Sequence, residues 1–312
     1  MSTVTPQLEL TPEELASLKA RTSVAGRAAI NAKKKLTSPG ASFAAVVLAF
    51  LWTIPTFGLL VTSFRPELQI KTTGWWTFFG NPETTLDNYR EVLSTEGSAG
   101  LGSYFINSFI IVIPSVIIPI SLALLAAYAF AWIDFPGKNF WFVVVFALQI
   151  VPIQVTLLPL LTLYVDANIA GSFWTIWLSH SIFALPLAIF LLHNFMKEIP
   201  KELIEAARVD GAGHVKILFR VLLPLLTPAL AAFGIFQVLW VWNDLLVALT
   251  FAGTSTDVAP ITVGLQALSG TRDTAWHLLS AGAFVSIIIP VAVFIGLQRY
   301  FVRGLLAGGL KG

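Results

Sequence analysis

Ionisable side chains inside long apolar stretches are the first candidates for chemistry in this chain of 312 residues. Asp244 follows Asn243 in one such stretch, and His180 and His193 lie in another. A carboxylate or imidazole in these surroundings can relay protons, pair with a cation or form part of a gate. The histidines have no carboxylate nearby in sequence and no metal-ligand spacing, which favours neutral, hydrogen-bonded helix residues. For Asp244, which with Asn243 lies near the end of its apolar stretch, a solvated or gate-forming carboxylate is favoured over a proton relay.

Enzymatic chemistry finds little support elsewhere in the sequence. Cysteine is absent, so the chain has no thiolate metal site and no cysteine nucleophile. It contains no GxxxxGK[ST] motif, which would cradle a nucleotide phosphate. A membrane-embedded hydrolase would need a nucleophile beside a base, or a metal constellation, and the scattered histidines offer neither. We expect no catalytic residue, cofactor or metal in this chain, and its net charge of +2 gives no reason to expect nucleic acid.

The stretch 197–224 differs from the rest of the chain and reads KEIPKELIEAARVDGAGHVKILFRVLLP. Pro200 suits the first turn of a helix, Glu202 follows near the positive helix end, and Gly211 supplies a stop. A second helix is expected from about His214, with Pro224 at the junction with the next apolar stretch. The pattern predicts a helix–turn–helix at the membrane surface.

The first of these two helices would expose small side chains between charges. Ala206 and Ala207 follow Glu205, and Asp210 lies one turn further on. Small residues allow another protein surface to approach the backbone closely. A polar connector whose glycines only turn the chain is the alternative, and on these residues alone the two interpretations carry equal weight.

The apolar stretches are long enough to cross a membrane. Hydrophobic residues make up 56% of the chain and charged residues only 12%, where a soluble domain has about 25% charged residues. About 20 apolar residues cross the roughly 30 Å of hydrocarbon. Six stretches meet this requirement, and we place helices near 42–63, 104–132, 140–164, 172–195, 225–250 and 278–300. Prolines inside nearly every stretch predict irregular, packed helices, so the fold class is an all-α integral membrane protein.

Basic residues indicate the orientation of the chain. Fifteen of the 19 Lys and Arg residues fall before the first span, between the second and third, between the fourth and fifth, or at and beyond the end of the sixth. Since basic residues of short loops stay in the cytoplasm, both termini are predicted to be cytoplasmic, and 64–103 and 251–277 to face outward. No signal peptide is evident. The predicted divisions are a cytoplasmic segment 1–41, a transmembrane domain 42–303 and a cytoplasmic tail 304–312.

Several motifs resemble those of one family. The loop contains motifs that resemble the cytoplasmic signature of ABC importer permeases: Glu205-Ala206-Ala207, Asp210-Gly211 and Val221-Leu222-Leu223-Pro224. Val221 stands where the family more often has isoleucine. Further segments are similar to the corresponding parts of maltose-type carbohydrate permeases: Phe135-Pro136-Gly137-Lys138, Trp242-Asn243-Asp244 and the run from Gly304 to Gly312. Within those, the chain resembles the shorter, six-helix member of the permease pair. The outer stretch 71–93 resembles permeases of alpha-glucoside systems.

The resemblance implies a subunit of a larger complex in the bacterial plasma (inner) membrane. Its partners would be a second, homologous permease, two ATPase subunits that hold ATP and Mg²⁺, and an extracytoplasmic solute-binding protein. The loop 197–224 would meet a groove on an ATPase through Glu205, Ala206, Ala207, Asp210, Gly211 and Pro224. The tail would enter the cleft between the ATPases through Gly304, Gly308, Gly309 and Lys311, and its glycines predict a poor helix. The outer loop 251–277 would contact the binding protein.

The solute and the energy source leave alternatives open. A carbohydrate, and among carbohydrates an oligosaccharide or alpha-glucoside, is the expectation, with a phosphorylated polyol or an amino acid as the alternative. A secondary transporter driven by an ion gradient would be expected to have paired intramembrane charges or inverted repeats. Neither feature is evident in the sequence.

Overall fold

The computed structural model describes residues 39–95, 100–269 and 275–309, with side chains as far as Gln298. Most of the predicted segment 1–41, and Lys311 of the predicted tail, lie outside these residues. All regular elements within the described ranges are helices, which confirms the all-α prediction. The chain divides into two units, Met1–Leu59 and Leu60–Gly312, and each is described by itself.

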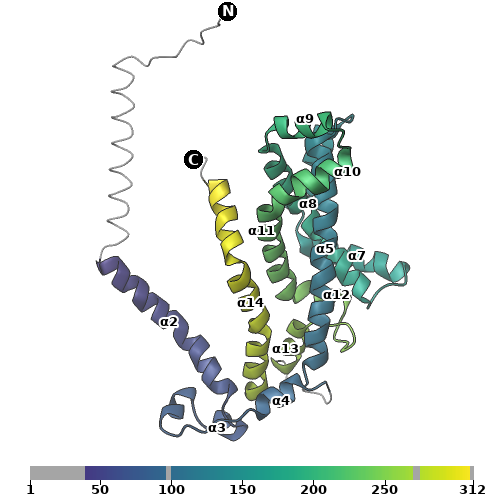
Figure 1. Ribbon diagram of the computed structural model, residues 1–312. Coiled ribbons are helices and arrows are strands. Elements are labelled where there is room, and N and C mark those ends of the chain that lie inside the picture. Colours follow the sequence, from purple (N-terminus) through teal and green to yellow (C-terminus); the bar gives the residue numbers. More distant parts are fainter. Residues whose placement is uncertain (1–38, 96–99, 270–274, 310–312) are drawn as a thin grey trace, which may run out of the picture. The chain divides into compact units, whose positions relative to one another are not determined.

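The first unit consists, where described, of most of one apolar helix, and the second of a helical bundle (Figure 1). The helix of the first unit is α2 (Pro39–Ser63), whose last four residues belong to the second unit. The long helices of the second unit are α5 (Gly102–Trp132), α8 (Phe173–Lys197), α11 (Leu223–Trp242) and α14 (Trp276–Gly309). Its shorter helices are α3 (Glu67–Thr72), η1 (Trp75–Phe79), α4 (Asp87–Leu93), α6 (Lys138–Ala147), η2 (Leu148–Ile150), α7 (Ile153–Asp166), α9 (Lys201–Val209), α10 (His214–Lys216), η3 (Ile217–Leu222), α12 (Leu246–Phe251) and α13 (Ile261–Ser269).

Helices α5 and α8 form the centre of the bundle and pack most extensively against each other. Small residues recur four apart on both helices, at Ala123 and Ala127 of α5 and at Ala184 and Ala188 of α8, and all four are buried in one cluster. Because interhelical packing in lipid is driven by close contact rather than by water exclusion, small side chains at this spacing favour a tight pair. A second cluster, which contains Trp242, occupies the other half of the bundle.

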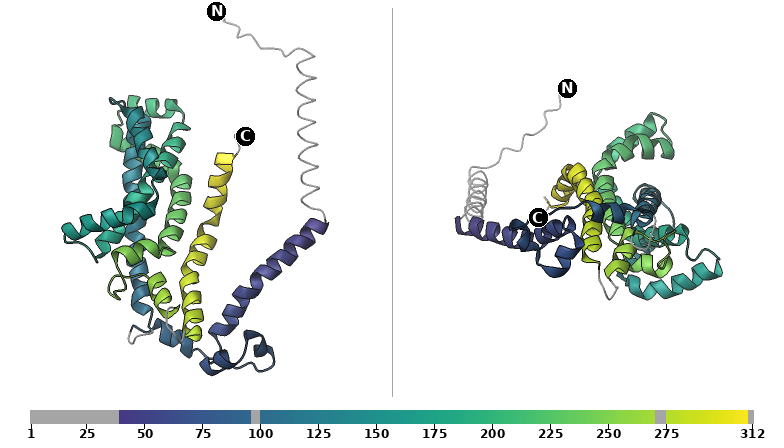
Figure 2. Two further views of the ribbon diagram at one scale, coloured as in Figure 1. Left: turned by 180° about the vertical axis from the view of Figure 1, so that it is seen from behind. Right: turned by 90° about the horizontal axis from the view of Figure 1, so that it is seen from below.

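The predicted third span, 140–164, is wrong as a single helix. Helices α6 and η2 run from Lys138 to Ile150, and α7 begins at Ile153 after a bend of 101°. Pro152 has no N–H to donate and disfavours a helical conformation in the residue before it, so Val151 is extended with ψ of 120°. Helix α7, labelled in Figure 1, projects sideways from the rest of the bundle there and in both views of Figure 2.

The predicted fifth span, 225–250, is shifted. A continuous helical path starts at His214, passes through η3 and ends at Trp242, and α12 follows as a separate helix. The segment η3 is a π-helix, in which each N–H bonds five residues back. In the described ranges, five helices are long and apolar enough to cross a membrane, or six when the bent α6–α7 pair counts as one.

The tail differs from its prediction as a poor helix. Helix α14 continues without a break through Gly304 and Gly308 to Gly309. A helix that is already nucleated extends at little cost per residue, and Leu305, Leu306 and Ala307 are strong helix formers, which offsets the glycines.

Candidate functional site

The loop between α8 and α11 folds, as predicted, into a helix, a turn and a second helix. Pro200, expected in the first turn, directly precedes α9, and Glu202 lies in that turn near the positive end of the helix dipole. After α9, Gly211 adopts a left-handed conformation with φ of 76°, which glycine tolerates without strain. The chain then enters α10 at His214, so the sequence correctly predicted both the turn and the helix after it.

One side of α9 is anchored in the bundle and the other is exposed. Ile204 is 2% exposed and belongs to the core cluster of α5 and α8. Glu205, Ala206 and Asp210 are exposed as predicted, whereas Ala207 is half-buried against that cluster. A partner can therefore approach the backbone closely over Ala206, between two carboxylates.

Exposed apolar side chains on this loop were not predicted. Val209 is 87% exposed, and Leu203 and Val215 are exposed as well. The sequence signal that could have predicted their exposure is their position away from the helix face on which Ile204 packs into the bundle. Apolar side chains exposed beside charges are typical of protein interfaces. The docking surface is defined here as Leu203, Glu205, Ala206, Val209, Asp210 and Val215.

A polar contact between Tyr128 and His214 ties the loop to α5. The Tyr128 hydroxyl lies 2.7 Å from Nδ1 of His214, and the two rings meet edge to face with centroids 5.8 Å apart. A hydrogen bond also closes the turn itself, from the Ala212 N–H to the Ala207 carbonyl at 2.9 Å. No partner was predicted for His214, because Tyr128 lies 86 residues away in the chain. The contact links the turn directly to the end of α5.

The same loop continues into α11 without leaving the helix. Pro224 is the second residue of α11, just after the π-helical segment η3, and it is exposed. Leu222 of η3 is fully buried in the core cluster that also holds Ile204. A displacement of α9 therefore reaches α11 through packed side chains as well as through the backbone.

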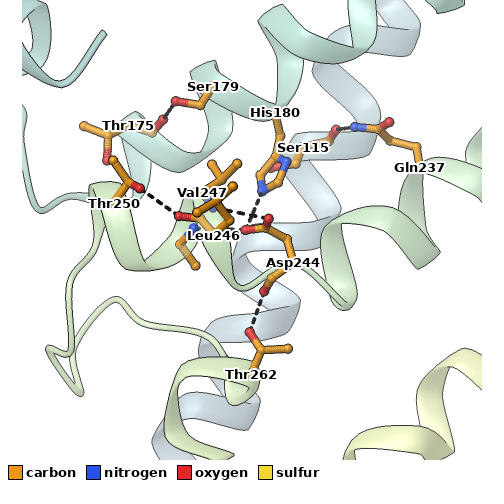
Figure 3. A network of polar contacts seen from close by, with 11 residues as sticks. Ser115, Thr175, Ser179, His180, Gln237, Asp244, Leu246, Val247, Thr250 and Thr262 are labelled. Atoms are coloured by element: carbon orange, nitrogen blue, oxygen red, sulfur yellow. Dashed lines mark hydrogen bonds and ion pairs between the residues drawn. The ribbon is translucent and has the colours of Figure 1, made fainter. Parts of the chain in front are cut away.

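Asp244 lies in the break between α11 and α12 (Figure 3). Its carboxylate accepts hydrogen bonds from the N–H groups of Val247 at 3.3 Å and Ala248 at 2.9 Å, so it caps α12. The Asp244 carbonyl accepts a hydrogen bond from the Thr262 hydroxyl at 2.5 Å, which ties α13 to the break. Of the two predicted alternatives, a solvated carboxylate is contradicted, since the side chain is only 10% exposed and is used as a cap. The gate-forming alternative stays a prediction. Asn243 beside it is exposed and bonds the Leu239 carbonyl.

His180 faces Asp244 across the bundle. Its Nε2 lies 3.7 Å from the Asp244 carboxylate, and its side chain is 1% exposed. Nδ1 of His180 has no hydrogen-bond partner among the described residues, which corrects the expectation of a hydrogen-bonded imidazole. His193 differs, because its Nδ1 lies 3.4 Å from the Asn194 amide oxygen. The proximity of His180 and Asp244 was not predicted, because the two residues lie in different parts of the chain.

Further polar groups cross the same region of the bundle (Figure 3). The Gln237 amide nitrogen of α11 donates to the Ser115 carbonyl of α5 at 3.1 Å. The hydroxyls of Tyr164 and Ser179 lie 3.0 Å apart and join α7 to α8. The Gln237 amide oxygen and the Ser115 hydroxyl have no partner among the described residues. Buried polar atoms without partners are rare and call for an explanation.

The segment before α5 folds around a buried arginine that the sequence did not single out. Arg65 is 1% exposed, and its Nη2 donates to the hydroxyls of Thr73 at 2.6 Å and Thr77 at 3.2 Å. In the neighbouring α3, a hydrogen bond from Lys71 lowers the pKa of the Glu67 carboxyl below its ordinary 4.5. These contacts hold α3 and η1 together as a structured part of the predicted outer segment 64–103.

The predicted outer loop 251–277 is attached to α5 where it is described. The Asn107 amide donates to the carbonyls of Thr256 at 2.9 Å and Ala259 at 3.1 Å, and the Ser108 hydroxyl accepts from the Ile261 N–H at 2.9 Å. Thr254 and Thr256 remain exposed. Within the described ranges, no three His, Asp or Glu residues come close enough together to hold a metal ion.

Comparison with known proteins identifies the family. Residues 119–306 match the family described as "Binding-protein-dependent transport system inner membrane component". The chain belongs to this family of ABC transporter permeases. It is therefore a multi-pass inner-membrane component of a transporter and not an enzyme.

Relatives and structures support the assignment of this permease. It is 51% identical, over 86% of its length and 90% of the relative, to the osmoprotective compounds uptake permease protein GgtD of Synechocystis sp.. It is 50% identical, over 74% of its length and 61% of the relative, to the alpha-glucoside transport system permease protein AglG of Rhizobium meliloti. A chain of the bacterial ABC transporter that imports the acidic polysaccharide alginate shares the fold, with a TM-score of 0.70 at 18% identity, over 86% of this permease and 98% of that chain.

Proposed function

We propose that this permease serves an ATP-binding-cassette importer for a carbohydrate of the oligosaccharide or alpha-glucoside class. The observation that carries the proposal is the 50% identity to a permease named for alpha-glucoside transport. In this proposal the chain crosses the membrane six times, with α6–α7 as one span and both termini in the cytoplasm. It lines half of the translocation path and pairs with a second, homologous permease.

Coupling to ATP hydrolysis is assigned to the docking surface. Two ATPase subunits bind at the cytoplasmic side and hold ATP and Mg²⁺, while Glu205, Ala206 and Asp210 enter a groove on one of them. The support is that α9 exposes these residues and is anchored behind them by Ile204. Closure of the ATPases then moves α9, and the contacts through Tyr128 and η3 pass that movement to α5 and α11 as a rigid-body switch.

Three further parts have roles in this scheme. A solute-binding protein docks outside on the loop 251–277, where Thr254 and Thr256 are exposed. Asn243 and Asp244 form part of the outer gate, because they lie where α11 stops and α12 turns away. The tail with Gly304, Gly308, Gly309 and Lys311 reaches the ATPase interface.

An importer of osmoprotective compounds is the second candidate function. It rests on the 51% identity to a permease named for the uptake of such compounds. The two candidates overlap where an osmoprotectant is itself a glycoside, and they differ where it is a zwitterion.

The coupling assignment is tested in the complete complex, purified with both permeases, both ATPases and the binding protein, and placed in liposomes. Glu205→Lys reverses a charge on the docking surface, and Gly211→Pro destroys the left-handed turn. Each should leave the chain inserted but lower solute uptake per ATP hydrolysed. The matched control is Asp166→Lys, an exposed charge reversal at the end of α7. Ordinary uptake by both loop variants, with the ATPases still bound, would contradict the coupling role.

A further inference from the structure

The short helix η1 differs from the rest of the predicted outer segment 64–103, because four of its five residues are aromatic. It runs from Trp75 to Phe79 with the sequence WWTFF, inside a stretch from 72 to 82 that carries no charge. The proposed importer function gives these side chains no role. Large apolar side chains that remain exposed on a folded chain usually mark a surface that something else covers.

The winding of η1 sorts its aromatic side chains into two pairs. In a 3-10 helix, residues three apart lie one above the other. Trp76 and Phe79 form one such pair and are 65% and 68% exposed, whereas the residues of the other pair, Trp75 and Phe78, are half-buried. Neighbouring rings meet edge to face, with centroids 6.2 Å apart for Trp75 and Trp76 and 6.0 Å apart for Phe78 and Phe79. The helix therefore presents two large aromatic side chains on one exposed side, supported from behind by two more.

Arg65 fixes η1 beside the end of α2. It follows the last residue of α2 by two positions, and its Nη2 donates to the hydroxyls of Thr73 at 2.6 Å and Thr77 at 3.2 Å. The Asn88 amide of α4 donates to the carbonyls of Ser63 and Arg65, both at 2.9 Å. The chain after α2 thus folds back on the end of that helix instead of extending away from it.

The end of α2 indicates the height of η1 relative to the membrane. Helix α2 has 25 residues and is apolar enough to cross a bilayer. At 1.5 Å per residue it is about 37 Å long, somewhat more than the roughly 30 Å of hydrocarbon. Ser63 therefore reaches the boundary between hydrocarbon and headgroups, and Arg65 holds η1 at that level. Tryptophan is enriched at this boundary, where its ring meets both lipid and water.

The neighbouring helix α3 has the mixture of side chains expected at a membrane surface. Leu68 is 75% exposed, and Glu67 and Lys71 form an exposed ion pair at 2.9 Å. Segments that lie in the interface combine apolar side chains that enter the lipid with charged side chains that remain in water. A protein partner would gain specificity from placed charges, and the stretch 72–82 offers none. These features favour lipid as the cover of the aromatic pair on η1.

From these observations we infer that η1 is a membrane anchor, whose Trp76 and Phe79 side chains insert among the phospholipids of the outer leaflet beside the end of α2. The inserted pair holds the outer segment at a fixed height on the membrane surface. The inference goes beyond the proposed importer function and does not depend on which solute is carried. The choice of the outer leaflet follows from the predicted orientation of the chain.

The first experiment measures what surrounds η1 in a bilayer. Cysteine is absent from the chain, so a nitroxide label can be attached at one chosen position of it, through Phe79→Cys or Thr84→Cys. The complete complex is placed in liposomes of phosphatidylethanolamine and phosphatidylglycerol, and the signal of wild-type complex treated in the same way is subtracted. Electron paramagnetic resonance then compares collisions with oxygen, which dissolves in lipid, and with a water-soluble nickel chelate. The label at position 79 should collide mainly with oxygen, and the label at the exposed position 84 mainly with the nickel chelate.

The second experiment tests whether the two side chains insert together. Adding Trp76→Ser to the labelled Phe79→Cys chain should lower the ratio of inserted to released η1 about tenfold, as expected when one large aromatic side chain no longer leaves water. Adding Trp76→Phe should retain most of the oxygen collisions. The matched control is Leu93→Ser, which removes a 52% exposed apolar side chain of α4 and should leave the label in lipid.

Four results would overturn the inference. The first is a label at position 79 that collides mainly with the nickel chelate, and the second is an equal shift in Leu93→Ser, which would indicate general loosening of the outer segment. The third is shielding from both reagents, or failure of the Trp76→Ser complex to assemble, because η1 would then be a subunit interface. The fourth is shielding that appears only when the binding protein is added, which would assign the surface to that protein. Sugar uptake by the same liposomes tests the proposed function separately.

Discussion

Replacing Tyr128 by phenylalanine should weaken the attachment of the docking surface to the helical bundle. The change removes the hydroxyl that lies 2.7 Å from Nδ1 of His214 and keeps the ring that packs edge-on against the imidazole. No cavity is created, so the effect is that of one hydrogen bond, about 0.5–1.5 kcal/mol. The ratio of the held to the released loop should fall roughly 2- to 13-fold, by the usual relation between free energy and populations.

The expected result is that solute moved per ATP hydrolysed falls by up to that factor, because a released loop passes less of the ATPase movement to α5. Uptake and ATP hydrolysis are measured on the same liposomes that contain the complete complex. Tyr164→Phe is the matched control. It removes a hydroxyl 3.0 Å from the Ser179 hydroxyl, which lies in the other half of the bundle, and it should keep the wild-type ratio.

Two results would refute this reasoning. One is a wild-type ratio in Tyr128→Phe. The other is an equal fall in Tyr164→Phe, which would indicate general loosening of the bundle. His214→Asn offers a rescue test, because its side-chain amide can still bond the Tyr128 hydroxyl, and it should lower the ratio less than His214→Ala.

Three other measurements test separate parts of the structure. Asp244→Ala should destabilise the detergent-purified protein by about 1–2 kcal/mol, the usual worth of a helix cap, while Asp244→Asn, which keeps one acceptor, should lose less; equal melting temperatures for the two variants would contradict the capping role. Removal of residues 304–312 should lower transport and ATPase activity while the complex still assembles, and full activity of the truncated complex would show that the tail is dispensable. Lys71 lowers the pKa of Glu67 in the folded protein. The stability that this pair gives α3 should therefore be complete above pH 4.5 and be lost as the pH falls through the folded-state pKa. In that pH range, hydrogen exchange in α3 should quicken in the wild type but not in Lys71→Met.

The sequence predicted best the features that depend on composition and on local helix and turn signals. Uncharged length located α5, α8 and α14 to within a few residues, apart from the extension of α14 through the tail, since the cost of charge in lipid leaves little freedom. The helix–turn–helix was predicted because Pro200 and Gly211 act on their own backbone. The docking surface was only partly predicted, because exposure of Val209 depends on which side of α9 the bundle anchors.

Features that depend on distant contacts could not be predicted. Pro114 and Pro159 lie inside continuous helices, whereas Pro152 ends one, so proline alone does not identify a break. Residue type showed that Asp244 was unusual but could not show that it caps α12 beneath His180. Partners for these groups come from helices that only the packed bundle brings together.

The π-helical segment η3 gives the connection between the docking surface and α11 a property that a plain α-helix would lack. Its wider winding holds extra chain length within a turn, between α9 on one side and the Gln237 and Trp240 side of α11 on the other. If one residue of that extra length is taken up into α winding, the two sides turn against each other by about 100° and slide by about 1.5 Å. Such a change would reset the angle between the docking surface and α11 while every residue stays helical.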